Sequence, residues 1–365
     1  MANASAFASL NGAGVLITGG AGFVGSRVAM ALAAEGARVT SLDNLHRRGS
    51  ELNLDALAAA GVTFVKGDVR VPGDLALHGA PIDLIVDCAA EPSVMAGRDG
   101  SPRYAIDSNL GGTINCVELA RERRARLVFL STSRVYPMST VNALKFKETA
   151  TRFALCAEQD VAGASGAGIA ETFPLAGART LYGTTKLASE LLIEEYAATY
   201  GLEASVLRFG VIAGPGQMGK TDQGVFCHWM ARHMFGGELA YHGWGGSGKQ
   251  VRDVVHIDDA TELVRTVLRM WPAMMGRTYN AGGGAVNSLS LLETTALCRD
   301  LTGKSLALGA RPATDPSDVR SYISDHSALT AATGWQPTKN PSRVLADIFE
   351  WMRADEQRLR AVFAS

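Results

Sequence analysis

The sequence predicts an α/β fold in which a doubly wound parallel sheet is followed by a smaller C-terminal α/β unit. Short apolar segments alternate with amphipathic helical patterns through the first half of the chain, and a glycine-rich turn follows the first of these segments. The 365 residues are 47% hydrophobic and 19% charged, which suits a large packed core. We expect one unit over residues 1–210 and a second over 211–365, with some later segments returning to the first.

The glycine-rich turn spans residues 18–25 and reads Thr-Gly-Gly-Ala-Gly-Phe-Val-Gly. It follows the apolar run 15–17 and opens an amphipathic helix, which is the context that a Rossmann-type dinucleotide site requires. Backbone amides at a helix N-terminus bind pyrophosphate, and a Cβ at the close-approach positions would hold the phosphates away. A glycine turn without a ligand is the alternative. We expect the cofactor's phosphates to lie against Gly19, Gly22, Phe23, Val24 and Gly25.

Asp43 ends the next expected strand and lies about 20 residues beyond the glycines. A carboxylate there accepts hydrogen bonds from the ribose and repels a 2′-phosphate, so it favours NAD over NADP. The basic run 46–48 argues the other way, although a charged loop is more often simply solvated. Asp68, after a further strand expected over 63–66, is placed to meet the adenine amino group. We also expect cofactor contacts from Asn44, Val69, Ala89 and Asn109.

A serine and a Tyr-x-x-x-Lys pattern follow in the order that hydride chemistry needs. Ser133 comes shortly after a strand expected over 127–130, and Tyr182 and Lys186 open a long helical pattern. Residues at i and i+4 share one helix face, so the lysine cation favours the tyrosine phenolate, which can take a hydroxyl proton. Lys186 can also bind the nicotinamide ribose, and Ser133 would hold the substrate oxygen. A lone pattern of this kind also occurs on solvated helices, but the preceding motifs argue against that here.

With these motifs, residues 15–351 resemble the extended short-chain dehydrogenase/reductases, whose motifs are TGxxGxxG, a post-strand serine or threonine, and YxxxK. The resemblance implies that Tyr182 is the acid/base, Lys186 its electrostatic partner and Ser133 a ligand of the substrate hydroxyl. It also implies a bound NAD and a nucleotide-diphosphate sugar as substrate. Within the family the chain is most similar to the CDP-paratose 2-epimerase (CDP-tyvelose epimerase) group. The similarity lies in residues 148–153, 248–254 and 286–293 and in an insertion over 154–178.

The chain also departs from the family pattern. The dehydratase members carry acidic residues where this chain has Ser133 and Arg134, which disfavours simple 4,6-dehydration. Asp87 and Glu91 stand where the family often has histidine and glutamine, so two carboxylates are added near the cofactor cleft. Pro137 replaces a usual glycine, and nothing in the sequence explains it.

Polar residues of the second half are candidates for substrate contacts. Arg252 lies in a segment that, in nucleotide-sugar members of the family, delivers an arginine to the substrate pyrophosphate, and a guanidinium can bind two phosphate oxygens at once. A surface ion pair with a neighbouring aspartate is the alternative. Arg320 or, less favoured by its spacing, Arg311 is expected to supply a second phosphate contact. Gln217 lies in the glycine-rich loop 214–219, which substrate contact and a plain surface turn explain equally well.

The leading hypothesis is an NAD-dependent nucleotide-sugar epimerase, which oxidises the sugar transiently and returns hydride to the opposite face. Rivals on the same scaffold are a net dehydrogenase or reductase, a dehydratase and a decarboxylase. A catalytically silent dinucleotide-binding protein is a rival of a different class. The complete set of Ser133, Tyr182 and Lys186 argues against that silent protein.

The composition argues against other classes of protein. With 35 basic and 36 acidic side chains, the chain has no basic field for nucleic acid. Its five cysteines are dispersed and its histidines lack metal-binding spacing, so we expect reduced thiols and no metal. No apolar stretch is long enough for a membrane span and the N-terminus lacks a signal-peptide pattern, so we expect a cytoplasmic protein. A homodimer or higher homo-oligomer is expected, through helices near 104–124 and 181–200, as in the family's relatives.

Overall fold

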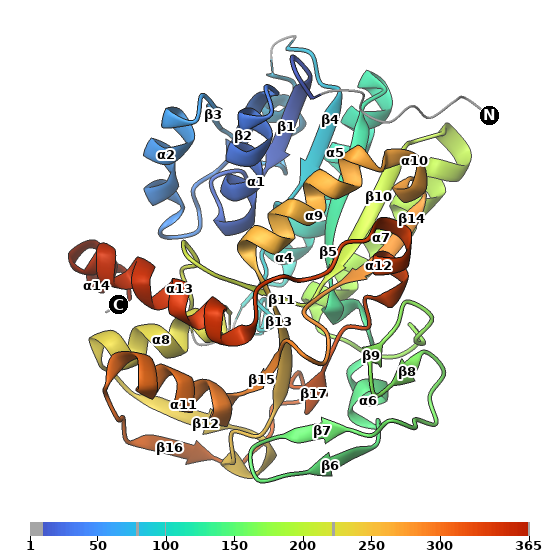
Figure 1. The fold of residues 1–365 in the computed structure, drawn as a ribbon. Helices are drawn as coiled ribbons and strands as arrows, with labels where there is room; N and C mark the ends of the chain where they lie inside the picture. Colours follow the sequence, from blue (N-terminus) through green and yellow to red (C-terminus); the bar gives the residue numbers. More distant parts are fainter. Residues whose placement is uncertain (1–9, 78–79, 99, 221–222, 364–365) are drawn as a thin grey trace.

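The computed structural model describes residues 10–77, 80–98, 100–220 and 223–363, and its central feature is a seven-stranded sheet (Figure 1). The strand order is β14-β10-β5-β4-β1-β2-β3, and every neighbouring pair is parallel. The order reverses between β1 and β4, and ligands of such sheets bind at the carboxyl ends of the strands beside this point. The strands are β1 (Gly14–Thr18), β2 (Arg38–Asp43), β3 (Thr63–Lys66), β4 (Leu84–Asp87), β5 (Arg126–Thr132), β10 (Ala204–Phe209) and β14 (Arg277–Ala281).

Helices cover both faces of this sheet. Two adjacent residues of β1 demonstrate it: Ile17 packs in one core with α1 and α9, whereas Leu16 packs in a separate core with α5 and α7. Both side chains are fully buried, and successive strand residues point to opposite faces. The predicted doubly wound sheet is therefore confirmed. The covering helices are α1 (Phe23–Ala34) and α9 (Ile257–Arg269) on one face, and α5 (Gly112–Arg123) and α7 (Leu181–Tyr200) on the other.

A smaller unit of short sheets occupies the lower part of Figure 1. Its central strand, β13 (Val251–His256), pairs with β11 (Val211–Ala213), β15 (Ser288–Ser290) and β17 (Ser321–Tyr322). Beside it, β12 (Leu239–His242) pairs with β16 (Leu308–Arg311). A hydrophobic core of its own joins these strands to four helices. They are α8 (Val225–Phe235), α11 (Leu291–Thr302), α13 (Pro341–Ala354) and α14 (Glu356–Phe363).

The segment between β5 and α7, which includes the insertion over 154–178, contains two hairpins. One joins β6 (Phe146–Glu148) to β7 (Phe153–Leu155), and the other joins β8 (Ala164–Ser165) to β9 (Gly168–Ile169). Segments beyond residue 210 also complete the large sheet, because β14 is its edge strand and α9 covers one face. The remaining helices are α2 (Leu54–Ala59), α3 (Pro72–Leu75), α4 (Arg103–Ile106), α6 (Met138–Asn142), α10 (Trp271–Met274) and α12 (Ser327–Thr333).

Some element ends differ from the sequence predictions. The strand expected over 127–130 extends to Thr132, and the helix expected over 104–124 is divided by a π-helical turn, Asp107–Gly111, between α4 and α5. No helix in the described part of the chain is long and apolar enough to cross a membrane. Residues 1–9, which bear on the expected lack of a signal peptide, lie outside the described residues.

Candidate active site

A cavity of about 650 Å³ runs along the carboxyl ends of β1, β2, β4 and β5 and reaches the start of α7. It brings together residues from the glycine turn, the ends of four strands, the catalytic helix and the loop after β11. Most of the residues predicted to bind cofactor or substrate line it: Gly19, Gly22, Phe23, Val24, Gly25, Asp43, Asn44, Asp68, Val69, Ala89, Ser133, Tyr182, Lys186 and Gln217.

The glycine turn has the shape that a pyrophosphate site needs. A Cβ on Gly19, which has a positive φ of 60°, would lie 2.9 Å from the Cα of Ala89, and one on Gly25 would lie 2.2 Å from the Gly19 carbonyl oxygen. Gly22 begins α1, and no side chain caps that helix or places a carboxylate in its first turn. The first amides of α1 are therefore open to an anion, and these residues fit the diphosphate of a dinucleotide.

Two carboxylates lie at the expected adenosine end. Asp43 accepts hydrogen bonds from the amides of Leu45 (2.8 Å) and Ala21 (3.1 Å), and burial raises its pKa. Asp68 is held by Arg70 (2.6 Å) and by the Asn44 amide (3.0 Å), and the Arg70 guanidinium holds the pKa of Asp68 well below its usual range. Both carboxylates thus have fixed positions at the rim of the cavity.

Asn109 does not line the cavity, although it was predicted to contact the cofactor. Its side-chain oxygen accepts from the amide of Glu91 (2.7 Å), and its nitrogen donates to the Glu91 carbonyl (3.2 Å) and to the Thr185 hydroxyl (3.1 Å). Asn109 therefore ties the loop after β4, which does line the cavity, to the helix that carries the catalytic pair.

The added carboxylate Asp87 lies behind the cavity wall. Its two oxygens accept from the hydroxyls of Thr18 (2.7 Å) and Thr113 (2.9 Å), and the side chain is buried. Glu91, in contrast, lines the cavity, and its charge raises the pKa of Tyr182. Of the two carboxylates that depart from the family pattern, Glu91 thus lines the cavity, whereas Asp87 lies behind its wall.

Tyr182 and Lys186 share one face of α7, whose first turn is capped by the Thr180 hydroxyl accepting from Gly183 (3.2 Å). Lys186 is 1% exposed, and its ammonium nitrogen lies 3.8 Å from the centre of the Phe129 ring. Burial lowers the pKa of Lys186, while the charge of Asp87 opposes that shift. The charge of Asp87 thus favours the cationic form of this buried lysine.

A buried ion pair fixes α7 against the sheet. Glu190, one turn beyond Lys186, pairs with Arg208 of β10 at 2.6 Å, and both side chains are less than 10% exposed (5% and 7%). The Ser131 hydroxyl donates to the same carboxylate, and Arg208 also donates to the Tyr136 hydroxyl (3.2 Å). These contacts hold the helix that carries Tyr182 in register with β5 and β10.

Thr132 is the site residue that the sequence reasoning missed. Its hydroxyl is hydrogen-bonded to Tyr182 and lowers the pKa of that phenol, against the larger effect of burial, which raises it. The same Thr132 oxygen accepts from the amide of Arg134 (3.2 Å). Ser133 lines the same cavity one residue further on. The predicted strand ended at residue 130, whereas β5 continues to Thr132. A prediction with the correct strand end would have selected Thr132, rather than Ser133, as the hydroxyl beside Tyr182.

A smaller hollow of about 40 Å³ opens beside the main cavity, and Ser133 and Arg134 line both. Arg252 lies in this hollow, where its guanidinium pairs with Asp318 (2.7 Å). The ion pair proposed as the alternative to phosphate binding is thus present, but with Asp318 as partner. Arg252 lines only this hollow, whereas Tyr182 lines the main cavity.

Arg320 and Arg311 line neither of these two cavities. The Arg320 guanidinium lies over the rings of Phe146 (3.9 Å to the centroid) and Trp244 (4.4 Å), which cover its faces. Arg311 ends the exposed strand β16. In this structure Arg320 joins the β6–β7 hairpin to the smaller unit, and neither arginine lines the hollow in which Arg252 lies.

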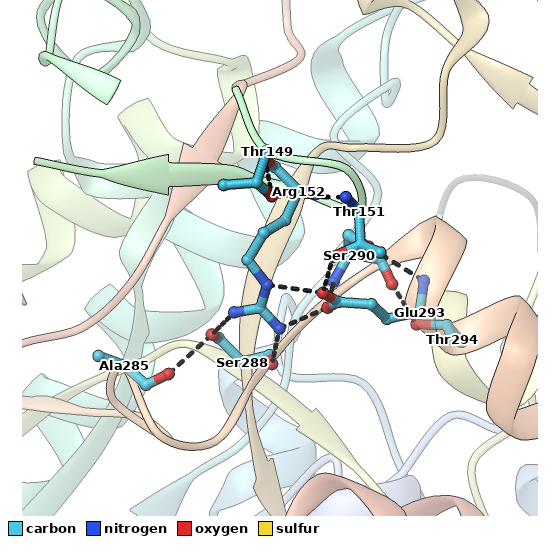
Figure 2. Close-up of polar contacts among 8 residues, drawn as sticks. All are labelled: Thr149, Thr151, Arg152, Ala285, Ser288, Ser290, Glu293 and Thr294. Atoms are coloured by element: carbon cyan, nitrogen blue, oxygen red, sulfur yellow. Dashed lines mark hydrogen bonds and ion pairs between the residues drawn. The ribbon is translucent and has the colours of Figure 1, made fainter. Parts of the chain in front are cut away.

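The three stretches that resemble the CDP-paratose 2-epimerase group contact one another, and Figure 2 shows the contacts between residues 148–153 and 286–293. Arg152 of the hairpin bonds Glu293 at the start of α11 through both its Nε (2.8 Å) and an Nη atom, and it donates to the Ser288 carbonyl (3.0 Å). Lys249, from the stretch 248–254, pairs with Glu148 (2.8 Å). We call the contact of Arg152 with Ser288 and Glu293 the hairpin latch.

Comparisons with known proteins agree with this geometry. Residues 15–282 match the NAD dependent epimerase/dehydratase family. The chain is 31% identical over 345 residues to CDP-paratose 2-epimerase of Salmonella typhi (92% of this chain, 98% of that one). It is 29% identical over 366 residues to dTDP-glucose 4,6-dehydratase of Xanthomonas campestris pv. campestris strain B100 (95% of each). The UDP-glucuronic acid 4-epimerase of Bacillus cereus, solved with UDP-glucuronic acid and NAD, has the same fold, with a TM-score of 0.76 at 21% identity (93% of this chain, 99% of that one).

The fold and the site define an NAD-dependent enzyme of the extended short-chain dehydrogenase/reductase class. The chain belongs to the NAD-dependent epimerase/dehydratase family, whose members act on nucleotide sugars, and NAD is its cofactor.

Proposed function

We propose that this protein is a nucleotide-sugar epimerase that oxidises one ring carbon to a ketone and then reduces it from the opposite face. The observation that carries the proposal is the meeting of Tyr182, Lys186 and Thr132 in one cavity with the uncapped start of α1. The 31% identity to a CDP-paratose 2-epimerase favours epimerisation and a CDP-sugar substrate.

The chain's own residues supply the proton transfers. Tyr182, as the phenolate, takes the proton of the sugar hydroxyl, and it returns this proton when the ketone is reduced. The Thr132 hydroxyl stabilises the phenolate by donating to it. The buried Lys186, one turn further along the same helix face, would hold the nicotinamide ribose and, as a cation, would favour the phenolate. Ser133, at the junction of the two cavities, holds the substrate oxygen. NAD, when bound, accepts the hydride and gives it back.

A loop along the cofactor cavity, which we call the strap, favours an enzyme that regenerates its cofactor in every cycle. The strap, residues 214–220, is tied to the first unit by Arg27, which donates to the Pro215 carbonyl (3.1 Å), and by Arg47, which donates to the Met218 carbonyl (2.7 Å). A net dehydrogenase must release its cofactor after each turnover, whereas an epimerase retains it. The strap therefore favours the epimerase over the net oxidoreductase.

We place the substrate diphosphate against Arg252 in the small hollow and the sugar between it and Tyr182. Gln217 supports a contact from the strap, because its side-chain nitrogen donates to Ile212 (2.9 Å) while its buried side-chain oxygen has no hydrogen-bond partner among the described residues. Ser133 and Arg134, which stand where dehydratases carry acidic residues, disfavour the elimination of water.

We also propose a homodimer built on α5 and α7. These helices pack together on one face of the sheet, and Leu191 of α7 (58% exposed) and Ile114 of α5 (39%) present apolar side chains outward. The expected interface would bury both.

The proposal is tested by incubating the purified protein with CDP-, UDP-, GDP- and dTDP-sugars. Inversion of one sugar stereocentre, seen by NMR without net change in nicotinamide absorbance, is the expected result. Steady accumulation of reduced nicotinamide would identify a net dehydrogenase, and a product lacking one water would identify a dehydratase. Either result would replace the epimerase assignment.

A further inference from the structure

Arg134 is a cation that the proposed mechanism leaves unused. It lies in the turn directly after β5, and its side chain lines both the main cavity and the small hollow. Its backbone touches the catalytic helix, since a Cβ on Gly183 would lie 2.0 Å from the Arg134 carbonyl oxygen. The backbone of Arg134 is thus fixed beside Gly183, the residue that follows Tyr182.

The guanidinium of Arg134 lies near the charge of Asp318, which raises its pKa, but it is not paired with that carboxylate. No carboxylate of the described residues forms an ion pair with it, and its Nη1 donates to the Ser317 carbonyl (3.1 Å). The neighbouring Asp318 is already bound by Arg252 (2.7 Å) and by the Trp244 indole (2.9 Å). Two arginines therefore share one carboxylate at the sugar side of the site.

Such an arrangement is unfavourable without a ligand. Burial lowers the pKa of Arg134 to about 10, and the charge of Arg252 adds to that shift. A purely structural donor to one carbonyl would use one of the five N–H groups of a guanidinium and would not need its charge. An anion placed between Arg134 and Arg252 would use the remaining donors and remove the repulsion.

We propose that Arg134 is a substrate-binding residue that contacts an anionic oxygen of the nucleotide sugar, beside the reacting hydroxyl and together with Arg252. The oxygen belongs either to the diphosphate or to a carboxylate on the sugar, and the chemistry that recognises it is the same. This inference rests on the proposed function, because it takes a nucleotide sugar as the ligand of the cavity.

The test compares binding to the NAD-loaded protein and to its Arg134→Gln variant by titration calorimetry, with UDP, UDP-glucose and UDP-glucuronic acid as probes. The matched control is Arg299→Gln, on the exposed surface of α11, where the side chain is 56% exposed. Loss of a charge-assisted contact weakens binding by about ten- to a hundred-fold. If Arg134 contacts the diphosphate, all three probes lose affinity. If it contacts a sugar carboxylate, only UDP-glucuronic acid does.

A change of less than about twofold for every probe would overturn the role of Arg134 while leaving the epimerase proposal intact. If the wild-type protein binds none of the three, the same comparison is made with CDP and CDP-glucose, and failure to bind these as well would overturn both. Arg134→Lys serves as a second variant that separates a lost contact from misfolding, because lysine keeps the positive charge but lacks the planar guanidinium. It is expected to lose less affinity than Arg134→Gln, and equal or greater losses in two folded variants would contradict a charge-based contact.

Discussion

At the scale of single residues, two opposing effects set the acidity of Tyr182. Burial raises its pKa, while the hydrogen bond from Thr132 and the nearby Arg134 cation lower it, and Glu91 acts with burial. The phenol must lose its proton to act as a base, so activity rises with pH through this pKa. Lys186 sits one turn further along the same helix face, and bound NAD adds its own positive charge.

Replacing Thr132 should therefore move the pH profile. Thr132→Val keeps the shape of the side chain but removes the hydroxyl, so the pKa of Tyr182 rises and the ascending limb of kcat/KM shifts to higher pH. A hydrogen bond to a charged group has a net worth of about 1.5–3 kcal/mol, which corresponds to roughly one to two pH units.

Ser133→Ala is the matched control for that change. It should reduce kcat/KM at all pH values with little movement of the limb, because Ser133 contacts substrate in our proposal and Thr132 holds the phenol. An unshifted profile in Thr132→Val, with a shifted one in Ser133→Ala, would reverse the two roles.

The sequence was sufficient to predict Tyr182 and Lys186, but not all of the residues that contact the predicted site residues. Tyr182 and Lys186 could be predicted because a helix fixes residues four apart on one face. Thr132 could not, because the prediction ended its strand at residue 130 and β5 continues to Thr132. The carboxylate partner of Arg252, Asp318, lies 66 residues away, and local patterns do not indicate such a contact.

At the scale of elements, the hairpin latch joins the β6–β7 hairpin to the smaller unit (Figure 2). Glu293 makes two kinds of contact there: it completes the capping box of α11 with Ser290, and it binds Arg152. The same carboxylate therefore caps α11 and holds the β6–β7 hairpin.

Removing the latch should destabilise the protein. Arg152→Ala leaves a half-buried Glu293 carboxylate without its guanidinium, at an expected cost of about 1–3 kcal/mol. Differential scanning calorimetry would record a lower Tm, and Arg299→Ala, on the exposed side of α11, should leave it unchanged. Equal Tm values for Arg152→Ala and wild type would show that the latch contributes no stability.

The element bounds were largely predictable, whereas the contacts between elements were not. The strand over 63–66 and the helix ending near residue 200 follow from local patterns, and the structure has them as β3 and α7. The latch joins residues 141 apart, so no local pattern indicated it. The same holds for Arg320, whose aromatic neighbours come from three separate segments.

At the scale of the whole molecule, the proposed homodimer depends on an apolar face of α5 and α7. A charge at its centre would be buried without a partner in the dimer, so Leu191→Arg should shift the protein to a monomer. Light scattering after size exclusion measures the mass directly, and Asp300→Arg, on the exposed surface of α11, where the side chain is 67% exposed, serves as the control. A dimer that survives Leu191→Arg would place the interface elsewhere.

The fold class was predictable from the alternation of strands and helices, since crossover rules leave few topologies for such a chain. The return of β14 to the edge of the large sheet was expected only in general terms. Its partner β10 lies about 70 residues earlier, and the pairing is set by packing over the whole molecule rather than by local sequence.

The proposed mechanism requires that hydride leaves the sugar and returns to the same carbon without leaving the active site. A nucleotide sugar deuterated at the carbon that is inverted tests this requirement, with purified protein and no added cofactor. We expect the epimerised product to keep its deuterium, and Tyr182→Phe, with NAD still bound, to form almost none of that product. Product carrying solvent hydrogen at that carbon would show that the hydride does not return, and the epimerase mechanism would be wrong.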